Sequence, residues 1–308
     1  MKSKNIKIIL LTVLVMMLWG SLFPVIKLSY SKMSVDVDSV PSIVLFAGLR
    51  FLICGIIICA ISYFKKLKLD KNFKESIVPV LSSGLFSVVL HYSLLYVGLS
   101  LTQSSKTSIL KQLGTLFYIC FCFLFVKEER FGFNKIIGAI FGFLGILAIG
   151  WTDGKVNFYV GDILIVGASF CTVFANLCSK KALKRNHPFL LTGVSQLFGG
   201  TVMVMFGLLT GGKLPVFNLS AIPVFSYMCI ASIVSYCLWN YVVANSVLSS
   251  LFIIKFSESV FACIFSAMLL SESILKWQYF IAYILIVAGI VMGSPSKKPQ
   301  HFKDNLDD

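Results

Sequence analysis

The sequence predicts an all-α integral membrane protein with ten transmembrane helices, arranged as two inverted five-helix repeats. Three observations predict this fold class. The 308 residues are 57% hydrophobic, with a mean hydropathy of +0.90. The apolar residues form ten runs long enough to cross a bilayer. The second half of the chain also repeats the first half at a shift of 144 residues, and such internal repeats are typical of membrane transporters.

The ten apolar runs give the expected helices in chain order. About 20 apolar residues span the hydrocarbon core as a helix, and the loops between the runs are too short for a soluble domain. The expected helices are 6–28, 41–64, 76–99, 104–126, 133–151, 159–179, 189–209, 221–244, 247–270 and 277–293. We therefore expect one repeat at 6–151, a second at 159–293, and a cytoplasmic tail at 294–308.

The basic residues give the orientation in the membrane. Most of the 27 Lys and Arg residues lie in alternate connecting segments, at 2–7, 65–74, 127–135, 180–185 and 297–303. Cytoplasmic loops carry the excess of Lys and Arg, which predicts a multi-pass protein of the plasma membrane with both termini in the cytoplasm. The net charge of +14 thus reflects orientation in a lipid bilayer, and nucleic acid is not an expected partner.

The repeat aligns without a gap. Five helices per half is an odd number, so the second half must cross the membrane in the opposite sense to the first. The aligned pairs include Pro79/Pro223, Tyr92/Tyr236, Ser105/Ser249, Lys111/Lys255, Glu128/Glu272 and Gly145/Gly289.

Small residues recur at close spacing in the fifth and tenth expected helices. They are Gly138, Gly142 and Gly145 in one, and Ala282 and Gly289 in the other. Such residues let helices approach closely in lipid. They serve either packing inside the protein or the face of a homodimer.

Lys111 and Lys255 are charges within apolar runs at matching places in the repeat. A lysine in hydrocarbon costs about 3 kcal/mol on insertion scales. Each lies about two turns into its helix, roughly 10 Å at 1.5 Å per residue, which is too deep to reach the interface comfortably. We predict that both face one substrate cavity; the structural alternative is that each bonds carbonyls or a carboxylate.

Other polar residues at membrane depth are candidates for the same site. Glu258 lies three residues after Lys255, which predicts an ion pair along one helix face, or alternatively a proton-coupling carboxylate. His91 either relays protons or packs as a hydrogen-bonded histidine. Trp239 and Asn240 are expected to line the cavity and contact substrate.

Two further basic residues are expected to act in a charge network. Arg50 lies in the middle of the second expected helix, where we predict a structural carboxylate partner, with substrate binding as the alternative. Lys27 lies near the outer end of the first and is expected to extend to the interface. The nine cysteines show no paired zinc spacing, and we expect neither metal nor cofactor.

Several motifs, taken in their order along the chain, resemble those of EamA-type members of the drug/metabolite transporter superfamily. They are WGSLFPVIK at 19–27, AGLRFLICG at 47–55, and acidic residues just after the fourth and ninth expected helices, in VKEERF and LSESIL. The resemblance covers residues 6–293 and implies an inverted-repeat carrier of small metabolites with a central cavity. The segment ILKQLGTLF is also similar to the lysine-bearing fourth helix of the triose-phosphate and nucleotide-sugar branches, where a proline commonly stands at the place of Thr115.

The charge balance within the expected helices indicates the substrate class. Four basic groups (Lys27, Arg50, Lys111 and Lys255) face one acid, Glu258, which favours a substrate with a carboxylate or phosphate. We predict a secondary transporter, an exporter, of a small anionic or zwitterionic metabolite. The alternatives are a lipid-carrier flippase and a membrane enzyme. The sequence contains neither HExxH nor GxSxG, which disfavours the enzyme.

Overall fold

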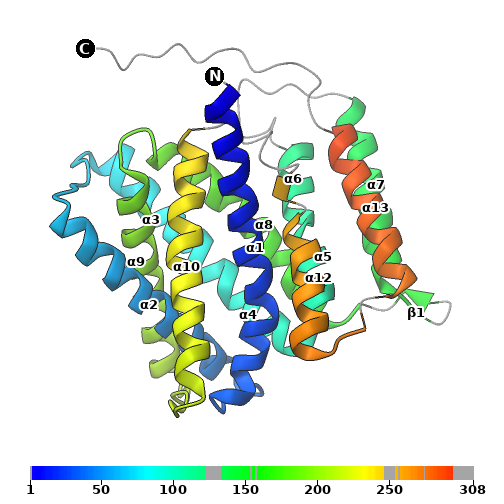
Figure 1. Cartoon of the computed structure of the whole chain (residues 1–308), viewed down its shortest axis with the longest axis horizontal. Coiled ribbons are helices and arrows are strands. Elements are labelled where there is room, and N and C mark those ends of the chain that lie inside the picture. Colours follow the sequence, from blue (N-terminus) through cyan, green and yellow to red (C-terminus); the bar gives the residue numbers. More distant parts are fainter. Residues whose placement is uncertain are drawn as a thin grey trace.

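The computed structural model describes residues 2–121, 133–152, 155–156, 158–245, 254–255, 257–273 and 275–293, and every expected transmembrane window contains helix (Figure 1). The α-helices are α1 (Lys2–Lys32), α2 (Val40–Phe64), α3 (Val78–Gly84), α4 (His91–Leu101), α5 (Ser104–Lys111), α6 (Leu113–Phe121), α7 (Phe133–Gly150), α8 (Val160–Ala182), α9 (Pro188–Leu209), α10 (Ala221–Ala244), α12 (Ser257–Leu270) and α13 (Trp277–Gly293). Ser249, Glu128 and the expected tail at 294–308 lie outside the described residues.

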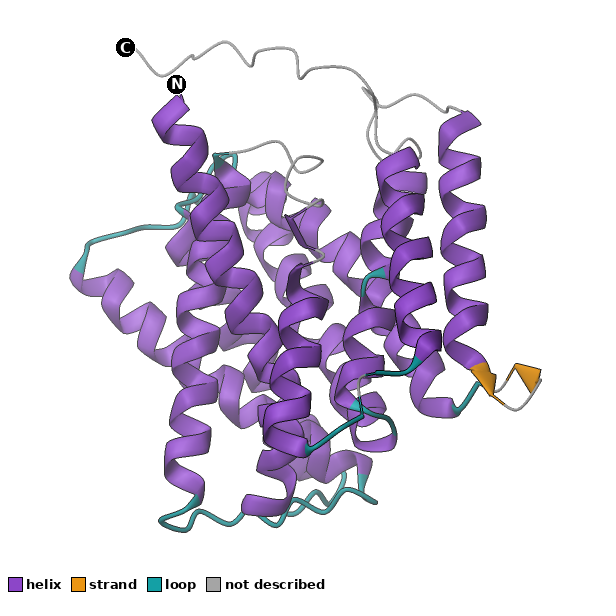
Figure 2. Ribbon diagram, turned by 45° about the vertical axis from the view of Figure 1, so that its right-hand side comes forward, coloured by secondary structure: helices purple, strands orange, loops and turns teal. Residues whose placement is uncertain are grey.

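Strand structure in the described residues is confined to one short hairpin. Its strands are β1 (Trp151–Thr152) and β2 (Lys155–Val156), paired antiparallel beside the end of α7. Figure 2 shows how small this hairpin is beside the helices. The protein is therefore all-helical in architecture.

Caps and prolines determine where several helices begin. Ser39 caps α2 through its side chain, and Pro188 is the first residue of α9. The first N–H groups of a helix have no intrahelical acceptor, so proline is tolerated there. Pro223 lies in the first turn of α10. Pro79 differs, because a π-helical turn, η1 (Phe73–Ile77), already begins the helix ahead of it.

The helix from η1 to α4 is continuous but not uniform. A second π-helical segment, η2 (Leu85–Leu90), joins α3 to α4. Single π-helical turns within α-helices are frequently found at functional sites. Here the segment contains Ser87 and is followed directly by His91, two residues that line the cavity described below.

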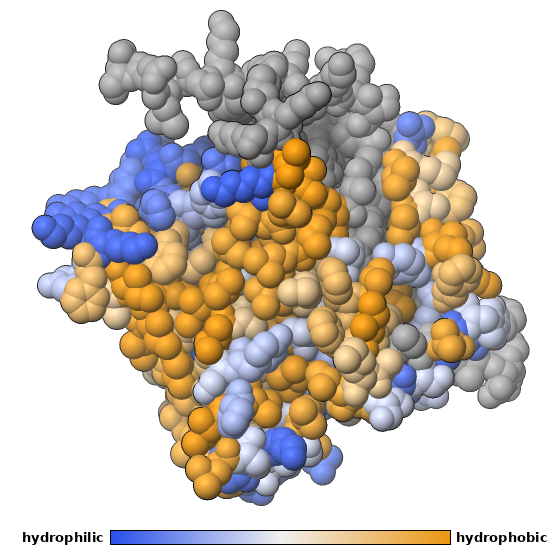
Figure 3. All heavy atoms as spheres, in the orientation of Figure 1, coloured by the Kyte–Doolittle hydropathy of each residue, from blue (hydrophilic) through white to orange (hydrophobic). Residues whose placement is uncertain are grey.

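The outer surface of the bundle is apolar. Within the part of the chain that the structure describes, six helices are long and apolar enough to cross a membrane. Figure 3 shows a broad hydrophobic region between hydrophilic patches at the upper left and the lower edge. The six helices are Ile6–Lys32, Val40–Phe64, Lys74–Leu101, Val160–Ala182, Pro188–Leu209 and Ala221–Ala244. A large exposed apolar surface of this kind is stable in lipid and not in water. The chain is a multi-pass membrane protein.

Glycines bring α2 and α9 into close antiparallel contact. A Cβ atom at Gly55 would lie 2.3 Å from the backbone nitrogen of Leu197, and one at Gly200 would lie 2.3 Å from that of Leu52. Only glycine allows two helix backbones to approach so closely.

The small residues predicted for packing join α7 to α13, the pair at the right of Figure 1. A Cβ at Gly289 would lie 2.7 Å from the carbonyl oxygen of Gly138, and one at Gly145 would lie 3.2 Å from that of Ala282. These residues therefore serve packing within the protein. A homodimer stays a prediction.

The central helices surround the cavity in two similar groups. In one, α1 packs beside α10 and α12; in the other, α8 packs beside α3, α4, α5 and α6. Figure 1 shows α1 and α12 between α2 and α9 at the left and the α7–α13 pair at the right.

Candidate substrate-binding site

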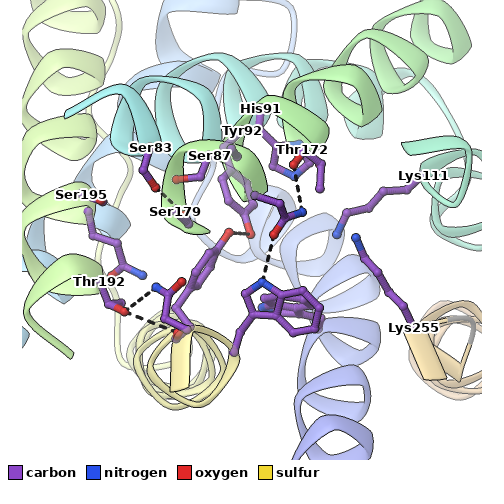
Figure 4. A pocket seen from close by; sticks show the side chains of 17 residues that line it. Ser83, Ser87, His91, Tyr92, Lys111, Thr172, Ser179, Thr192, Ser195 and Lys255 are labelled. Carbon is purple, nitrogen blue, oxygen red and sulfur yellow. Dashed lines mark hydrogen bonds between the residues drawn. The ribbon is translucent and has the colours of Figure 1, made fainter. Parts of the chain in front are cut away.

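A polar cavity lies among the central helices, with a volume of about 60 Å³. At about 10–15 Å³ for each water molecule, this space holds a few waters. Figure 4 shows the lining side chains. They are Trp19, Ser83, Ser87, His91, Tyr92, Lys111, Thr172, Ala175, Asn176, Ser179, Thr192, Ser195, Gln196, Tyr236, Trp239, Asn240 and Lys255.

The cavity is nearer to the end of the bundle that carries the N-terminus. Its residues on α9, among them Thr192 and Ser195, lie in the first two turns of that helix. Its residues on α10 lie in the last two turns, at Trp239 and Asn240, or one turn earlier, at Tyr236.

Lys111 and Lys255 both line this cavity, from one side of it (Figure 4). Lys111 is the last residue of α5, and the helix resumes at Leu113 as α6. Lys255 lies shortly before α12, and its side chain is 3% exposed. The two repeat-related lysines thus bring two basic groups to one end of a polar space.

The acid beside these lysines pairs across helices. Lys111 Nζ donates to Glu258 Oε1 at 2.7 Å, and Glu258 is fully buried. We expect a pair with Lys255, three residues earlier in the expected helix, and this stays a prediction. The packing of α5 against α12 brings Lys111 to the carboxylate as well. Glu258 lies behind Lys111 and not among the residues that line the cavity, although it was predicted to contact substrate.

Aromatic rings form the wall between the lysines and the opposite end. Trp19 packs against Tyr236 and Trp239, with ring centroids 5.5 and 5.2 Å away. Tyr236 donates a hydrogen bond to the Tyr92 hydroxyl at 2.7 Å. These two tyrosines are an aligned pair of the sequence repeat. Flat rings of this kind can contact the apolar or aromatic part of a substrate.

Three other predicted site residues lie on the cavity wall with hydrogen-bond partners. His91 Nδ1 lies 2.8 Å from the Ala168 carbonyl oxygen, which accepts its proton, and Trp239 Nε1 donates to Asn176 Oδ1 at 3.2 Å. Asn240 Nδ2 donates to Thr192 at 2.8 Å. These bonds fix the side chains in place, so the wall is preorganised.

Gln196, a polar residue at membrane depth, is a further residue of the cavity wall. It is 1% exposed, and neither its amide nitrogen nor its amide oxygen has a hydrogen-bond partner among the described residues. An unpaired buried amide is costly, so this group is suited to a ligand that both accepts and donates. Its position one turn after Thr192 on α9 was the available signal, because residues four apart share a helix face.

Arg50 is not on the cavity wall and has no carboxylate partner, contrary to our expectation. Its side chain is fully buried, and its guanidinium carbon lies 4.3 Å from the ring centroid of Phe51 and 5.3 Å from those of Tyr92 and Tyr96. The described acids of this chain lie elsewhere. Aromatic faces replace the predicted ion pair.

Lys27 is also held inside the protein. Its Nζ donates to the carbonyl oxygen of Thr102, at the end of α4, at 2.5 Å. The side chain is half-buried, and its extension to the membrane interface stays a prediction. Nearby, Lys106 pairs with the buried Asp162 at 2.7 Å.

Glu272 closes the same end of the bundle. Its carboxylate accepts from the backbone N–H groups of Ser104 and Ser105, at 2.9 and 3.0 Å, and from the Ser105 hydroxyl at 2.7 Å. A carboxylate at the first N–H groups of a helix is favourable, both as a cap and with the helix dipole. These bonds join α5 to the loop between α12 and α13, on the side of the cavity away from the N-terminus.

The arrangement is suited to binding a small anion or zwitterion. At one end of the cavity, two lysines and one nearby acid give a net positive charge. At the other end, side-chain amides and hydroxyls form a polar surface without charge. Among the described residues no group of three His, Cys, Asp or Glu side chains could hold a metal ion.

Comparison with known proteins gives a family model that matches almost the whole chain. The model, described as the EamA-like transporter family, matches residues 6–151 and 159–294. A solved crystal structure resembles this chain with a TM-score of 0.62 and 17% identity, over 93% of this chain and 96% of that chain. At this identity the likeness shows the fold alone.

Curated relatives of the chain are named as transporters. A protein of Archaeoglobus fulgidus named "Uncharacterized transporter" is 26% identical over 298 residues, which cover 94% of this chain and 97% of that protein. A second such protein of A. fulgidus is 24% identical over 282 residues, covering 91% and 83%. "Uncharacterized transporter YdfC" of Bacillus subtilis is 23% identical over 206 residues, covering 67% and 63%.

Proposed function

The chain belongs to the EamA-like transporter family, and on this premise we propose that it is a secondary transporter that exports a small anionic or zwitterionic metabolite. The observation that carries the proposal is the position of Lys111 and Lys255 on the wall of one polar cavity. One acid, Glu258, lies beside Lys111, so basic groups outnumber acidic ones at this end of the cavity. A carboxylate or phosphate of the substrate would complement this excess of positive charge.

We further propose that the chain crosses the membrane ten times, as two inverted repeats at 6–151 and 159–293. The family model matches twice, once in each half. The hydroxyls of Tyr92 and Tyr236, which the repeat aligns, meet at 2.7 Å. The contacts of α1 with α10 and α12 correspond to those of α8 with α3–α4 and α5–α6. A substrate site between inverted repeats is typical of secondary transporters.

The proposed mechanism is alternating access around the lysine cavity. In this structure the cavity is nearer to the end with the N-terminus, and the bonds of Lys27, Lys106 and Glu272 close the other end. If the N-terminus is cytoplasmic, as the distribution of Lys and Arg favours, this conformation accepts substrate from the cytoplasm. Export then requires those bonds to break while α5 moves relative to α12.

The alternative of a lipid-carrier flippase is less well supported by the described residues. A lipid-facing groove is present between α2, α4, α8 and α9, lined by residues such as Val44, Leu94, Val202 and Phe206. Its lining contains one polar residue, Ser93, and no charged one that could hold a phosphate head group. The polar cavity therefore favours a soluble metabolite. The transporter family and the absence of catalytic motifs in the sequence favour a transporter over an enzyme.

An uptake screen in proteoliposomes tests the function. The purified protein is assayed with amino acids, organic acids, sugar phosphates and organic cations, with and without a proton gradient. We expect uptake of a compound with a carboxylate or phosphate. Uptake restricted to organic cations would contradict the proposal.

Cysteine labelling tests the orientation after the native cysteines are replaced. Single cysteines at Lys71 and Lys184 should be protected from an impermeant thiol reagent in intact cells. Single cysteines at Lys213 and Ser220, at the opposite end, should be labelled. The reverse pattern would overturn the assignment of both termini to the cytoplasm.

A further inference from the structure

The most unusual group in the protein is the guanidinium of Arg50. It is fully buried, and its Nε, Nη1 and Nη2 atoms have no hydrogen-bond partner among the described residues. The hydroxyl of Tyr96, whose ring centroid is 5.3 Å from the guanidinium carbon, is also buried and unpartnered. One cluster therefore contains four polar atoms whose hydrogen-bonding capacity is unused in this conformation.

This arrangement is not explained by stability. Arginine stays protonated inside proteins, and a buried charge without a hydrogen-bonded partner is unfavourable. The rings of Phe51, Tyr92 and Tyr96 offset part of that cost through cation–π contacts. An apolar side chain of similar size would commonly be more stable at such a position. The guanidinium therefore indicates a role in another conformation.

Arg50 lies directly beyond the cavity, separated from it by one residue. The ring of Tyr92 both lines the cavity and contacts the guanidinium, and its hydroxyl is held by Tyr236. Tyr96 follows Tyr92 one turn nearer to the end of α4, away from the cavity. The Tyr30 hydroxyl donates to the Tyr96 carbonyl at 2.8 Å and covers that side.

We propose that Arg50 is a second binding station for the anionic group of the substrate, reached when the transporter opens toward the closed end. This inference rests on the proposed transport function. In the present conformation Lys111 and Lys255 line the cavity, and the Tyr92–Tyr236 contact separates them from Arg50. When the opposite end opens, the guanidinium and the Tyr96 hydroxyl become available to it.

The chemistry of the group fits a carboxylate or a phosphate. A guanidinium presents parallel N–H donors that bind two oxygens of such an anion at once. The Tyr96 hydroxyl can supply a further donor. A lysine in the same place would offer a point charge without this fork, so Arg50→Lys should not restore full function.

Modification of arginine by phenylglyoxal in proteoliposomes tests whether Arg50 becomes accessible. Peptide mass spectrometry follows Arg50 and the exposed Arg185 separately, so Arg185 is an internal control. We expect Arg50 to react more slowly than Arg185 in the wild-type protein. Glu272→Gln removes the carboxylate that closes the end, and should speed the reaction of Arg50 alone. Inorganic phosphate or acetate should slow the modification of Arg50 and leave the rate of modification of Arg185 unchanged.

An Arg50 that stays unreactive in both proteins would overturn the proposal. If phosphate or acetate slowed the modification of both arginines equally, the effect would be unspecific, and the proposal would also be overturned.

The variant Arg50→Met distinguishes the role of the second binding station from that of the lysine cavity. Arg50→Met should fold with equal or higher thermal stability and retain acetate binding, followed by tryptophan fluorescence, within about twofold. Its transport should fall about tenfold or more, whereas the matched surface variant Arg185→Met should transport normally. Normal transport by folded Arg50→Met would contradict the second station. If acetate and phosphate bind the wild-type protein nowhere, the proposed function itself fails, independently of Arg50.

Discussion

Lys111 and Arg50 are both basic residues at membrane depth, but the protein treats their charges differently. Lys111 lies on the wall of the polar cavity and has a buried carboxylate, Glu258, at 2.7 Å. Arg50 lies outside the cavity among aromatic rings and has no acid beside it. The difference teaches that one buried charge has a partner within the protein, whereas the nitrogens of the other have no hydrogen-bond partner among the described residues, as the proposed second station requires.

The largest effect expected from this comparison is on stability. Lys111→Met removes the hydrogen-bond donor that lies 2.7 Å from the buried carboxylate of Glu258, which should lower the free energy of unfolding by about 3–5 kcal/mol. Arg50→Met removes an unpaired charge and should leave that free energy unchanged or higher. Denaturant unfolding of the purified variants in detergent measures both.

The double variant is the control for this prediction. Lys111→Met with Glu258→Gln removes both charges and should recover most of the lost stability. Equal destabilisation by Lys111→Met and Arg50→Met would show that the two sites do not differ in the way described.

Substitution of Lys255 tests whether a positive charge on the cavity wall contributes to substrate binding. A charge-assisted hydrogen bond contributes about 1.5–3 kcal/mol, so Lys255→Met should weaken binding of an anionic substrate about ten- to a hundredfold. Equilibrium binding to the monodisperse variant measures this, with the exposed Lys213→Met as control. Lower expression with unchanged affinity in the folded protein would instead make Lys255 a structural residue.

Substitution of Gln196 tests whether the uncharged polar end of the same cavity contributes to substrate binding. Gln196→Leu removes a buried amide with no partner, so stability should rise by about 1 kcal/mol. If the substrate bonds that amide, its affinity should fall about tenfold. Thr201→Val on the same helix, an exposed position, is the control. A variant with higher stability and full affinity would exclude the amide from the site.

The smallest effect is expected at the boundary between the cavity and Arg50. Tyr236→Phe removes the hydroxyl bond to Tyr92 and should lower the free energy of unfolding by about 0.5–1.5 kcal/mol. The same change should speed phenylglyoxal modification of Arg50, since it loosens the contact between the two regions. An unchanged modification rate would show that the tyrosine pair does not separate them.

The sequence was sufficient for features that depend on composition and periodicity. Apolar runs predicted the positions of the helices, because a membrane helix must satisfy its own backbone groups and expose apolar side chains to lipid. The small residues at Gly145 and Gly289 correctly indicated close packing. The family resemblance is confirmed by the family model.

The sequence was insufficient where a contact depends on tertiary packing. Spacing along one helix indicated Lys255 beside Glu258 but gave no sign of Lys111, which the approach of α5 to α12 brings to the same carboxylate. Arg50 was expected to have a carboxylate because buried charges are usually paired. The break between α5 and α6 and the π-helical segment η2 also had no sequence signal, because both are local departures from an apolar helix.

The central claim is that the cavity recognises a negative charge through its lysines. The most direct measurement compares the binding of a transported carboxylate with that of its uncharged amide, in the wild-type protein and in Lys255→Met. The wild-type protein should prefer the carboxylate by about ten- to a hundredfold, and the variant should lose that preference while retaining weak binding of both compounds. An undiminished preference for the carboxylate in the folded variant would contradict the claim.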